Sequence, residues 1–343
     1  MHNICDKLKV DCLIVSKDTD IYYHTNFNGS FGILLCFKDR KILITDPRYK
    51  HFKTKKAEVL VTTDLKKDIK EILIKEKIQS VGFQNQELQY SSYWNLKKIF
   101  KNCKFRQDNG SISKLRVVKS KQEIQKLTAA QRLNEQTLHK SLPLLRQGIT
   151  EKEFKNIIKI NALTLGAEGF SFEPIVAFGK NSANIHHSAT DYKLKNSDVV
   201  LIDMGVTLDG YQSDMSRTFL PKTANEDLKN DYLKVLASFK AGIKDSKNQV
   251  PIIQLDKIAR EQLHPDNFNH ALGHGIGLDV HEQPFISKKS KEKLQKNMVI
   301  TIEPGIYRKN KYGIRIEDVV VVGLKSGESI SNFPSNISQV IWG

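Results

Sequence analysis

Residues 198–220 of this chain read DVVLIDMGVTLDGYQSDMSRTFL and decide the fold. The apolar runs on either side of LDG predict two strands joined by a tight turn. If Leu208 and Asp209 form a two-residue loop, Asp203 faces Asp214, and directly opposed residues have Cβ atoms about 4.5–5.5 Å apart. Asp is depleted in strands. Two aspartates on one face of an apolar strand pair are therefore unusual, although one such pair alone also fits a position on the surface.

A second strand pair repeats this arrangement at residues 298–322, which read MVITIEPGIYRKNKYGIRIEDVVVV. A turn at residues 309–311 places Glu303 opposite Glu317. Two carboxylates about 4 Å apart repel each other by about 4 kcal/mol at an effective dielectric constant of 20. If the two pairs converge, the four carboxylates need cations or shared protons. Metal ions are the simplest solution.

Histidines are concentrated in the same part of the chain. The segment NHALGHGIGLDVHEQP at residues 269–284 contains three of them, and two more are adjacent to each other upstream: His270, His274 and His281, then His186 and His187. The seven-residue spacing of His274 and His281 excludes the HExxH helix of zinc proteases. Because Gly has no Cβ, the glycines of LGHGIG predict a close approach of the backbone to a site.

The length of 343 residues suggests two domains, at roughly 100–200 residues each. Residues 107–114 are polar and rich in turn formers, so we place a boundary there, between residues 1–112 and 113–343. In the first domain we expect strands at 11–16, 32–45 (a pair), 58–62 and 80–83, and helices at 65–77 and 90–100. In the second we expect helices at 120–145, 150–166, 225–247 and 252–263, with a capping box opening the second of these.

Composition excludes several classes of protein. Hydrophobic residues make up 39% of the chain and charged residues 27%, as in ordinary globular domains. No apolar run approaches the roughly 20 residues that span a bilayer, and the first residues lack the apolar core of a signal peptide. We therefore expect a cytoplasmic protein with no membrane partner. The four cysteines form no CxxC pair, which is typical of reduced thiols.

The formal net charge of +16 raises the question of nucleic-acid binding. The basic residues are 44 Lys and only 10 Arg, and the lysines are spread along the whole chain. Arg is the usual reader of phosphates and base edges. The charge therefore predicts a solvated, lysine-rich surface and no nucleic-acid partner.

Taken together, the motifs resemble those of a known family. Asp203-x10-Asp214, His274-x6-His281, TIEPG and GIRIED are similar, in order and spacing, to the metallopeptidases of the pita-bread fold, which include methionine aminopeptidase, aminopeptidase P and prolidase. YYHTNFNGSFG and ITDPRY resemble the creatinase-type N-terminal domain of the aminopeptidase P and prolidase branch, with SKLRVVKS at its junction and EGFSFEPIVAFG leading to the pocket. The implied fold is α/β (α+β): a small α/β N-terminal domain followed by a pita-bread-fold catalytic domain.

The resemblance also implies a role for each site residue. Two divalent metal ions are expected, bridged by two carboxylates and completed by the other ligands: Asp214 and Glu317 as bridges, Asp203 on one metal, His274 and Glu303 on the other. The oxygen-rich set favours Mn, Fe or Co over a thiolate-type zinc site, and the resemblance implies manganese, with Co, Fe or Zn as alternatives. His186 and His281 are implied as catalytic residues, Glu303 as a proton shuttle, and His270 and Arg315 as substrate-binding residues.

The resemblance leaves alternatives open. The implied activity is hydrolysis after an N-terminal residue that precedes proline, by an Xaa-Pro aminopeptidase or an Xaa-Pro dipeptidase. A metal-free creatinase-like hydrolase and an inert binding protein on the same fold are more remote. A homodimer is expected, and Arg48 serves either a neighbouring subunit's pocket or an ion pair. Phe170, Phe172 and Phe178 line a proline pocket or, as the pattern favours, pack in the core.

Overall fold

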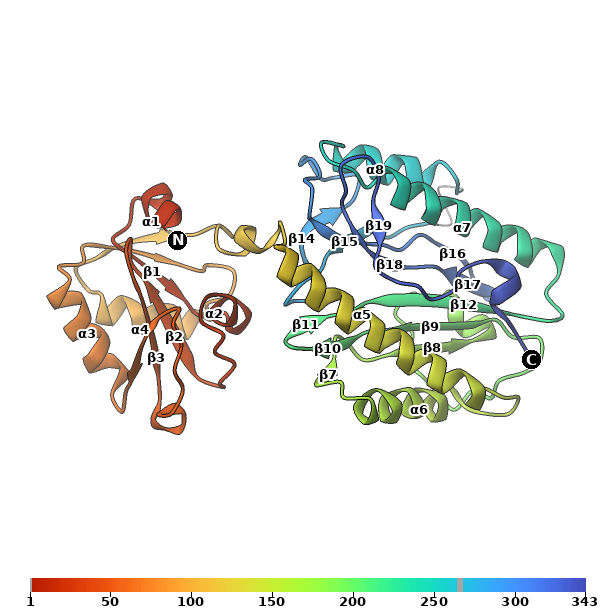
Figure 1. The fold of residues 1–343 in the computed structure, drawn as a ribbon, viewed down its shortest axis with the longest axis horizontal. Coiled ribbons are helices and arrows are strands. Elements are labelled where there is room, and N and C mark those ends of the chain that lie inside the picture. Colours follow the sequence, from red (N-terminus) through yellow and green to blue (C-terminus); the bar gives the residue numbers. More distant parts are fainter. Residues whose placement is uncertain (1, 264–267) are drawn as a thin grey trace. The chain divides into compact units, whose positions relative to one another are not determined.

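The computed structural model describes residues 2–263 and 268–343. The chain divides into two compact units, Met1–Arg116 and Val117–Gly343, each with buried hydrophobic clusters of its own. Figure 1 shows strands enclosed by helices in both units. None of the helices in these residues is long and apolar enough to cross a bilayer.

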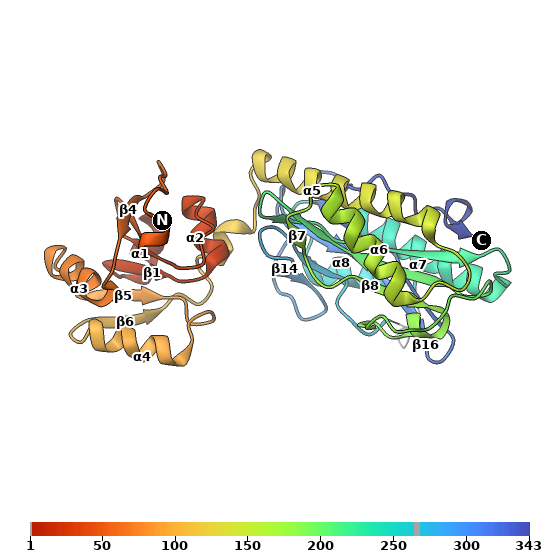
Figure 2. The same ribbon diagram turned by 90° about the horizontal axis from the view of Figure 1, so that it is seen from below.

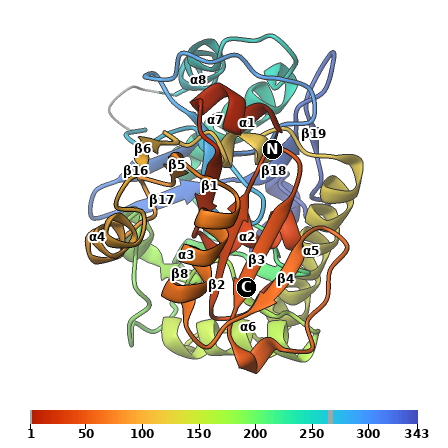
Figure 3. The same ribbon diagram turned by 90° about the vertical axis from the view of Figure 1, so that its left-hand side faces the viewer.

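The N-terminal unit is built on a six-stranded mixed sheet with the order β4-β3-β2-β1-β5-β6 (Figure 3). Its strands are short: β1 Cys12–Val15, β2 Gly32–Cys36, β3 Lys41–Thr45, β4 Glu58–Val61, β5 Ser80–Phe83 and β6 Lys104–Gln107. Strand β1 is buried at all four positions because its side chains enter two separate hydrophobic clusters, one on each face. A continuous apolar run, rather than an alternating one, encodes such a strand.

Four helices complete this unit: α1 His2–Leu8, α2 Asp18–Thr25, α3 Leu65–Lys75 and α4 Tyr90–Ile99. The expected strands and helices are present. Helices α1 and α2 and strand β6 were not predicted. Helix α2 and strand β6 have no apolar pattern. Helix α2 buries the polar residues Asp20 and His24, and β6 is a largely exposed edge strand.

Four helices flank the strands of the C-terminal unit (Figures 1 and 2): α5 Lys121–Ser141, α6 Glu151–Thr164, α7 Glu226–Asp245 and α8 Ile252–Arg260. Helices α5 and α6 each begin at a capping box, in which the N-cap and third residues satisfy each other's backbone N–H groups. Helix α5 ends earlier than expected. Pro143 follows in the short 3₁₀ turn Leu142–Leu144, because Pro cannot continue an α-helix.

The strands between these helices form several sheets. Two are central to the site, with orders β20-β12-β9-β8 and β14-β13-β15-β18-β19, and smaller ones are β11-β10-β7 and β16-β17. Their bounds are short: β7 Gly169–Phe170, β8 Ile175–Phe178, β9 Val200–Met204, β10 Val206–Leu208, β11 Tyr211–Gln212, β12 Met215–Pro221, β13 Gly273–Gly275, β14 Glu282–Ile286, β15 Val299–Ile302, β16 Gly305–Arg308, β17 Tyr312–Arg315, β18 Asp318–Val321, β19 Glu328–Ser329 and β20 Ile341–Trp342.

The aspartate hairpin, residues 200–221, differs in register from the prediction. Leu208 pairs with Tyr211, so the loop is Asp209-Gly210, with φ of 50° and 74°. A type I′ turn needs positive φ at both central residues, which suits Asp-Gly and not Leu. The register therefore moves by two residues, and Ser216, not Asp214, is opposite Asp203. A two-residue shift preserves the face, so both aspartates still point to one side.

The glutamate hairpin, residues 299–321, has the predicted register. Arg308 pairs with Tyr312 around the turn, and Val299 pairs with Val321 at the far end. The same register continues between these two pairings, where it places Glu303 opposite Glu317. The pleat is interrupted there, and the Ile316 N–H donates to the Pro304 carbonyl.

Candidate active site

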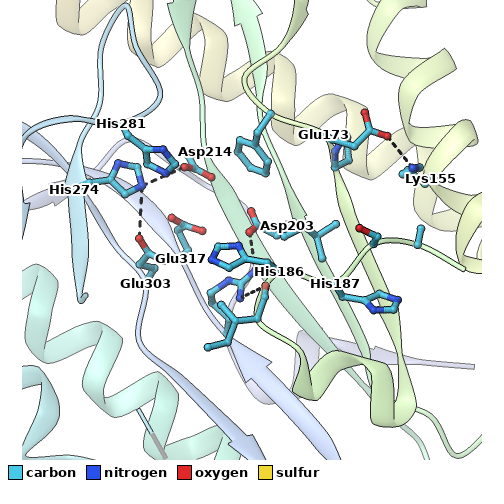
Figure 4. A pocket seen from close by; sticks show the side chains of 17 residues that line it. Lys155, Glu173, His186, His187, Asp203, Asp214, His274, His281, Glu303 and Glu317 are labelled. Atoms are coloured by element: carbon cyan, nitrogen blue, oxygen red, sulfur yellow. Dashed lines mark hydrogen bonds and ion pairs between the residues drawn. The ribbon is translucent and has the colours of Figure 1, made fainter. Parts of the chain in front are cut away.

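A cavity of about 320 Å³ lies in the C-terminal unit (Figure 4). Its walls come from residues 172–175 at the start of β8, from residues 185–189, and from the two hairpins. All the predicted site residues except His270 line it: His186, Asp203, Asp214, His274, His281, Glu303, Arg315 and Glu317. Segments that are far apart in the sequence therefore meet at one place.

Three side chains in this cavity form a cluster of the kind that can hold a metal ion. Asp214, His274 and Glu317 are buried, and one ligand atom of each lies within 4.8 Å of the others. The Nδ1 of His274 is 3.0 Å from the Gly275 carbonyl, to which it donates, and its Nε2 is 3.6 Å from Asp214 Oδ2. An imidazole held in this way offers the lone pair of its second nitrogen to a cation.

Asp203 differs from the other carboxylates because it has a cationic partner. Arg315 Nη2 donates to its Oδ2 over 2.6 Å, and Arg315 Nε donates to Ser216 Oγ over 2.8 Å. The Oδ1 atom of Asp203 is buried and has no hydrogen-bond partner among the described residues. A buried carboxylate oxygen without a donor is expensive, so this atom fits a cation.

Burial and mutual repulsion act on the remaining carboxylates. Burial raises the pKa of Asp214 and Glu317 well above the usual range, and the neighbouring carboxylates raise both further. Burial raises the pKa of Glu303 to about 8, against the lowering effect of Arg315. Four carboxylates with one guanidinium leave three excess negative charges if all ionise. Oxygen-rich donor sets of this charge suit hard divalent cations, so the residues fit the implied metals.

The predicted catalytic histidines occupy different positions. His281 is exposed, and its ring lies edge-on to His274 with centroids 4.3 Å apart. Its ring is nevertheless partly enclosed by the cavity, and this desolvation lowers the pKa of His281, opposed by Asp203. His186 is exposed in the 185–189 segment and faces the cavity, whereas His187 Nε2 donates to the buried Glu151 carboxylate over 2.8 Å.

His270 lies behind the cavity wall rather than in it. Its Nε2 is 3.1 Å from Tyr307 Oη, and its Nδ1 donates to the Ala271 carbonyl over 2.8 Å. Tyr307 Oη in turn accepts from Arg315 Nη1 over 3.0 Å. The two predicted substrate-binding residues, His270 and Arg315, are therefore joined through a tyrosine that the sequence reasoning missed.

The glycines around His274 serve strand packing. A Cβ on Gly273 would lie 1.9 Å from the Thr301 carbonyl oxygen, and one on Gly275 would lie 2.2 Å from that of Gln283. The close approach inferred from LGHGIG is therefore between β13 and its two neighbouring strands. It brings the His274 N–H to Thr301 Oγ1, at 3.0 Å, and so fixes the backbone of His274.

Other predicted side chains divide between cavity and core. Phe172 lines the cavity, while Phe178 is fully buried in the main hydrophobic cluster and Phe170 packs against a smaller one. In the N-terminal unit, Arg48 forms a bidentate ion pair with Asp46, with Nη2 to Oδ2 at 2.6 Å.

Sequence reasoning also missed Glu151 and Ser216. Ser216 Oγ donates to Glu317 Oε2 over 2.7 Å, which connects the two hairpins. The only sequence signal for Glu151 was its place in the capping-box segment, and that motif explains residues 150 and 153 instead.

Comparison with known proteins decides the family. Residues 125–323 match metallopeptidase family M24, and residues 1–118 match the creatinase/prolidase N-terminal domain. The chain belongs to metallopeptidase family M24. This confirms the resemblance inferred from the motifs, together with the expected α/β fold and the peptidase class.

Solved structures of this M24 family are similar over the whole chain. The X-Pro aminopeptidase of Thermotoga maritima is 31% identical with a TM-score of 0.92, and the alignment covers 99% of each chain. The Xaa-Pro dipeptidase of Bacillus anthracis is 30% identical with a TM-score of 0.95, covering 99% of this chain and 98% of that one. A putative Xaa-Pro aminopeptidase of Mycoplasma pneumoniae is 33% identical, over 94% of this chain and 92% of the relative.

Proposed function

We propose that this M24 metallopeptidase is an Xaa-Pro aminopeptidase, which hydrolyses the bond between an N-terminal residue and a following proline. The observation that carries the proposal is the cluster of Asp214, His274 and Glu317 at one end of a cavity with Phe172 and Pro174 in its wall. An apolar wall suits a proline ring. The names of the similar proteins support the same substrate class.

Five residues would hold two divalent cations, with manganese as the expected metal: Asp214 and Glu317 as the carboxylates shared between them, Asp203, and His274 with Glu303. The buried, unpartnered Oδ1 of Asp203 and the raised pKa values of the other carboxylates support this set. All five positions hold ligand-type side chains, which argues against a metal-free hydrolase or an inert protein. Bound cations supply Lewis acidity, which activates the attacking water and polarises the scissile carbonyl.

The remaining chemistry belongs to the side chains around this cluster. Glu303 takes the proton of the attacking water and passes it to the leaving prolyl nitrogen. His186 and His281 hold the substrate and donate hydrogen bonds to the oxyanion as charge develops on it. Arg315 holds Asp203, and His270 supports Arg315 through Tyr307.

One feature favours dipeptidase activity as the second candidate. Lys155 lines the cavity and lies 2.7 Å from Glu173, with its side chain only 20% exposed. Unlike Arg315, which is occupied by Asp203, Lys155 has an exposed partner that a substrate carboxylate can displace. A dipeptide presents that carboxylate on the proline itself.

The test combines metal analysis with three substrates. We expect about two metal equivalents, turnover of an Xaa-Pro-Yaa tripeptide with Mn²⁺, and a preference of about tenfold or more over Xaa-Ala-Yaa. Comparison with the Xaa-Pro dipeptide then separates aminopeptidase from dipeptidase action. A metal-loaded protein that cleaves none of the Xaa-Pro peptides would overturn the proposal.

Three further proposals concern the whole protein. We assign residues 1–112 to the creatinase-type N-terminal domain and residues 113–343 to catalysis. We also propose a homodimer in the cytoplasm, and the four unpaired cysteines fit a reducing compartment. Gel filtration with light scattering tests the dimer.

A further inference from the structure

Glu151 carries a buried carboxylate with an unusually complete set of donors. Its side chain is fully buried at the first position of α6. Oε1 accepts from the Phe178 N–H at 2.8 Å and from Asn181 Nδ2 at 2.9 Å. Oε2 accepts from the Thr190 N–H at 2.8 Å, from Thr190 Oγ1 at 2.7 Å and from His187 Nε2 at 2.8 Å. Five hydrogen bonds therefore converge on one side chain.

These donors bracket the segment that carries His186. Phe178 and Asn181 precede His186, and His187 and Thr190 follow it. Residues 184–190 contain no helix or strand, and residues 185–189 line the cavity. Among the described residues, no strand pairing holds this stretch. The Thr190 carbonyl accepts from the Lys152 N–H of α6 and the Ile185 carbonyl accepts from Arg315 Nη1, so the position of His186 depends on these contacts together with the donors to Glu151.

The anchor itself stands on a rigid helix. The capping box at residues 150 and 153 already satisfies the first turn of α6, so Glu151 is not needed as a cap. Phe154 and Ile158 on the same helix are fully buried in the main hydrophobic cluster. Burial raises the pKa of Glu151, but the hydrogen bonds outweigh it and bring the pKa to about 2. The carboxylate therefore stays ionised and keeps accepting from all its donors.

We propose that Glu151 is a positioning residue that holds the 178–190 segment against α6 and thereby places His186 in the cavity. This rests on the catalytic role proposed above for His186. Glu151 touches neither substrate nor the metal-ligand cluster. Its effect on the reaction passes through the segment that it anchors.

A double-mutant cycle tests the proposal. Glu151→Gln keeps the size of the side chain but turns an amide N–H₂ toward at least one of the donors. We expect kcat/KM on an Xaa-Pro peptide to fall about 10-fold to 100-fold, with metal content unchanged. His186→Ala alone should lose about 10²–10³-fold. In the double variant the loss should equal that of His186→Ala alone, because Glu151 acts through His186.

Phe154→Leu is the matched control for simple destabilisation. It loosens the same helix in the core and leaves all five donors to Glu151 in place, so we expect a lower melting temperature with kcat/KM retained at a temperature where the variant is folded. If Glu151→Gln does not fold, Thr190→Val replaces it in the cycle. That variant removes one hydroxyl donor to Glu151, with an expected loss of about threefold to tenfold.

The outcomes separate the two proposals. If His186→Ala loses activity but the losses of the two variants multiply, Glu151 does not act through His186 and the positioning role falls alone. Full activity of Glu151→Gln overturns it in the same way. If His186→Ala is fully active, the assigned role of His186 in the proposed function is wrong, and the positioning role falls with it.

Discussion

The two carboxylate hairpins place their acidic pairs in different registers. In the glutamate hairpin the register continues from Val299 and Val321 to the turn, and Glu303 is opposite Glu317. In the aspartate hairpin Asp203 is paired with Ser216, and Asp214 lies two residues from direct opposition. The offset separates the aspartates along the strand and leaves Asp203 within reach of Arg315.

The difference shows where external cations are needed. Asp203 is already neutralised in part by a buried guanidinium. Among the described residues, neither Asp214 nor Glu317 pairs with a guanidinium or ammonium group. Asp214 has only the His274 ring nearby. The pKa values of Asp214 and Glu317 are raised by burial and by neighbouring carboxylates. The cluster that most needs metal therefore takes one carboxylate from each hairpin.

The largest expected effect comes from removing either of these two charges. Asp214→Asn or Glu317→Gln should abolish turnover and release at least one metal equivalent, because a neutral amide cannot balance two cations. The two variants should be equally affected, since the proposal gives each hairpin one of the two shared carboxylates. Metal analysis and peptide hydrolysis check this. Full activity with two metals bound in either variant would contradict the assignment.

Removing Arg315, the cation of the glutamate hairpin that pairs with Asp203, gives the next effect. Arg315→Met leaves Asp203 buried without its partner, and breaking a buried ion pair costs about 3–5 kcal/mol. We expect the free energy of unfolding of the chelated protein to fall by that order, measured by urea denaturation. Arg315→Lys should recover only part of it, because Lys lacks the fork that reaches Asp203, Ser216 and Tyr307 together. Unchanged stability would show that the pair contributes nothing net.

Substitutions of the catalytic histidines outside both hairpins should lower the rate without changing the metal content. His186→Ala and His281→Ala should keep the metal and lower kcat by about 10²–10³-fold, as for the loss of one oxyanion donor. His274→Ala is the contrasting variant and should lose metal. If His186→Ala loses metal and His274→Ala does not, their roles have been exchanged.

Much of this arrangement could be predicted from the sequence. The turn predicted at residues 309–311 places Glu303 opposite Glu317, which is the register observed. LDG offers two placements, and only the positive φ of Asp209 and Gly210 selects between them. The prediction that the two aspartates share a face was still right, because a two-residue slip preserves the face. Tyr307 and Glu151 could not be found, because their roles arise from contacts with segments distant in sequence.

Chelation should destabilise the protein through the same carboxylates. Metal that binds only the folded state stabilises it by about 2.7 kcal/mol when free metal is 100 times its Kd. Without metal, burial raises the pKa of Asp214 and Glu317 in the folded state, and that of Glu303 to about 8. These groups bind protons more weakly when unfolded, so their contribution to stability is full below about pH 4 and is lost as pH rises toward 8.

Melting of chelated and Mn²⁺-loaded protein at about pH 7 and pH 5.5 measures this effect. The difference between the two forms should be larger at pH 7, and mild acid should recover part of the stability lost on chelation. Asp214→Asn is the control for titration elsewhere in the chain, and its chelated form should respond less to pH. If chelation leaves the melting temperature at pH 7 unchanged, these carboxylates do not share a tight metal site.

The smallest effects are expected at the two turns, and they test what sets each register. Gly210 has a φ of 74° and Asn310 a φ of 61°, and neither residue lines the cavity. An Ala in this left-handed region costs about 1–2 kcal/mol. Gly210→Ala and Asn310→Ala should therefore lower the free energy of unfolding by about that amount or less, with Asn310→Ala the milder because Asn already carries part of the strain.

Both turn variants should keep their metal and their kcat/KM, because the strand pairings beyond the turns hold the carboxylates in place. The aspartate hairpin is the more sensitive of the two to a change of register. A slip of two residues there preserves the buried face and brings Asp214 directly opposite Asp203, away from the offset that separates them. If Gly210→Ala is stably folded but has lost metal while Asn310→Ala has not, the Asp-Gly turn itself sets the offset. If both variants retain their metal equally, the strand pairings rather than the turns set the register.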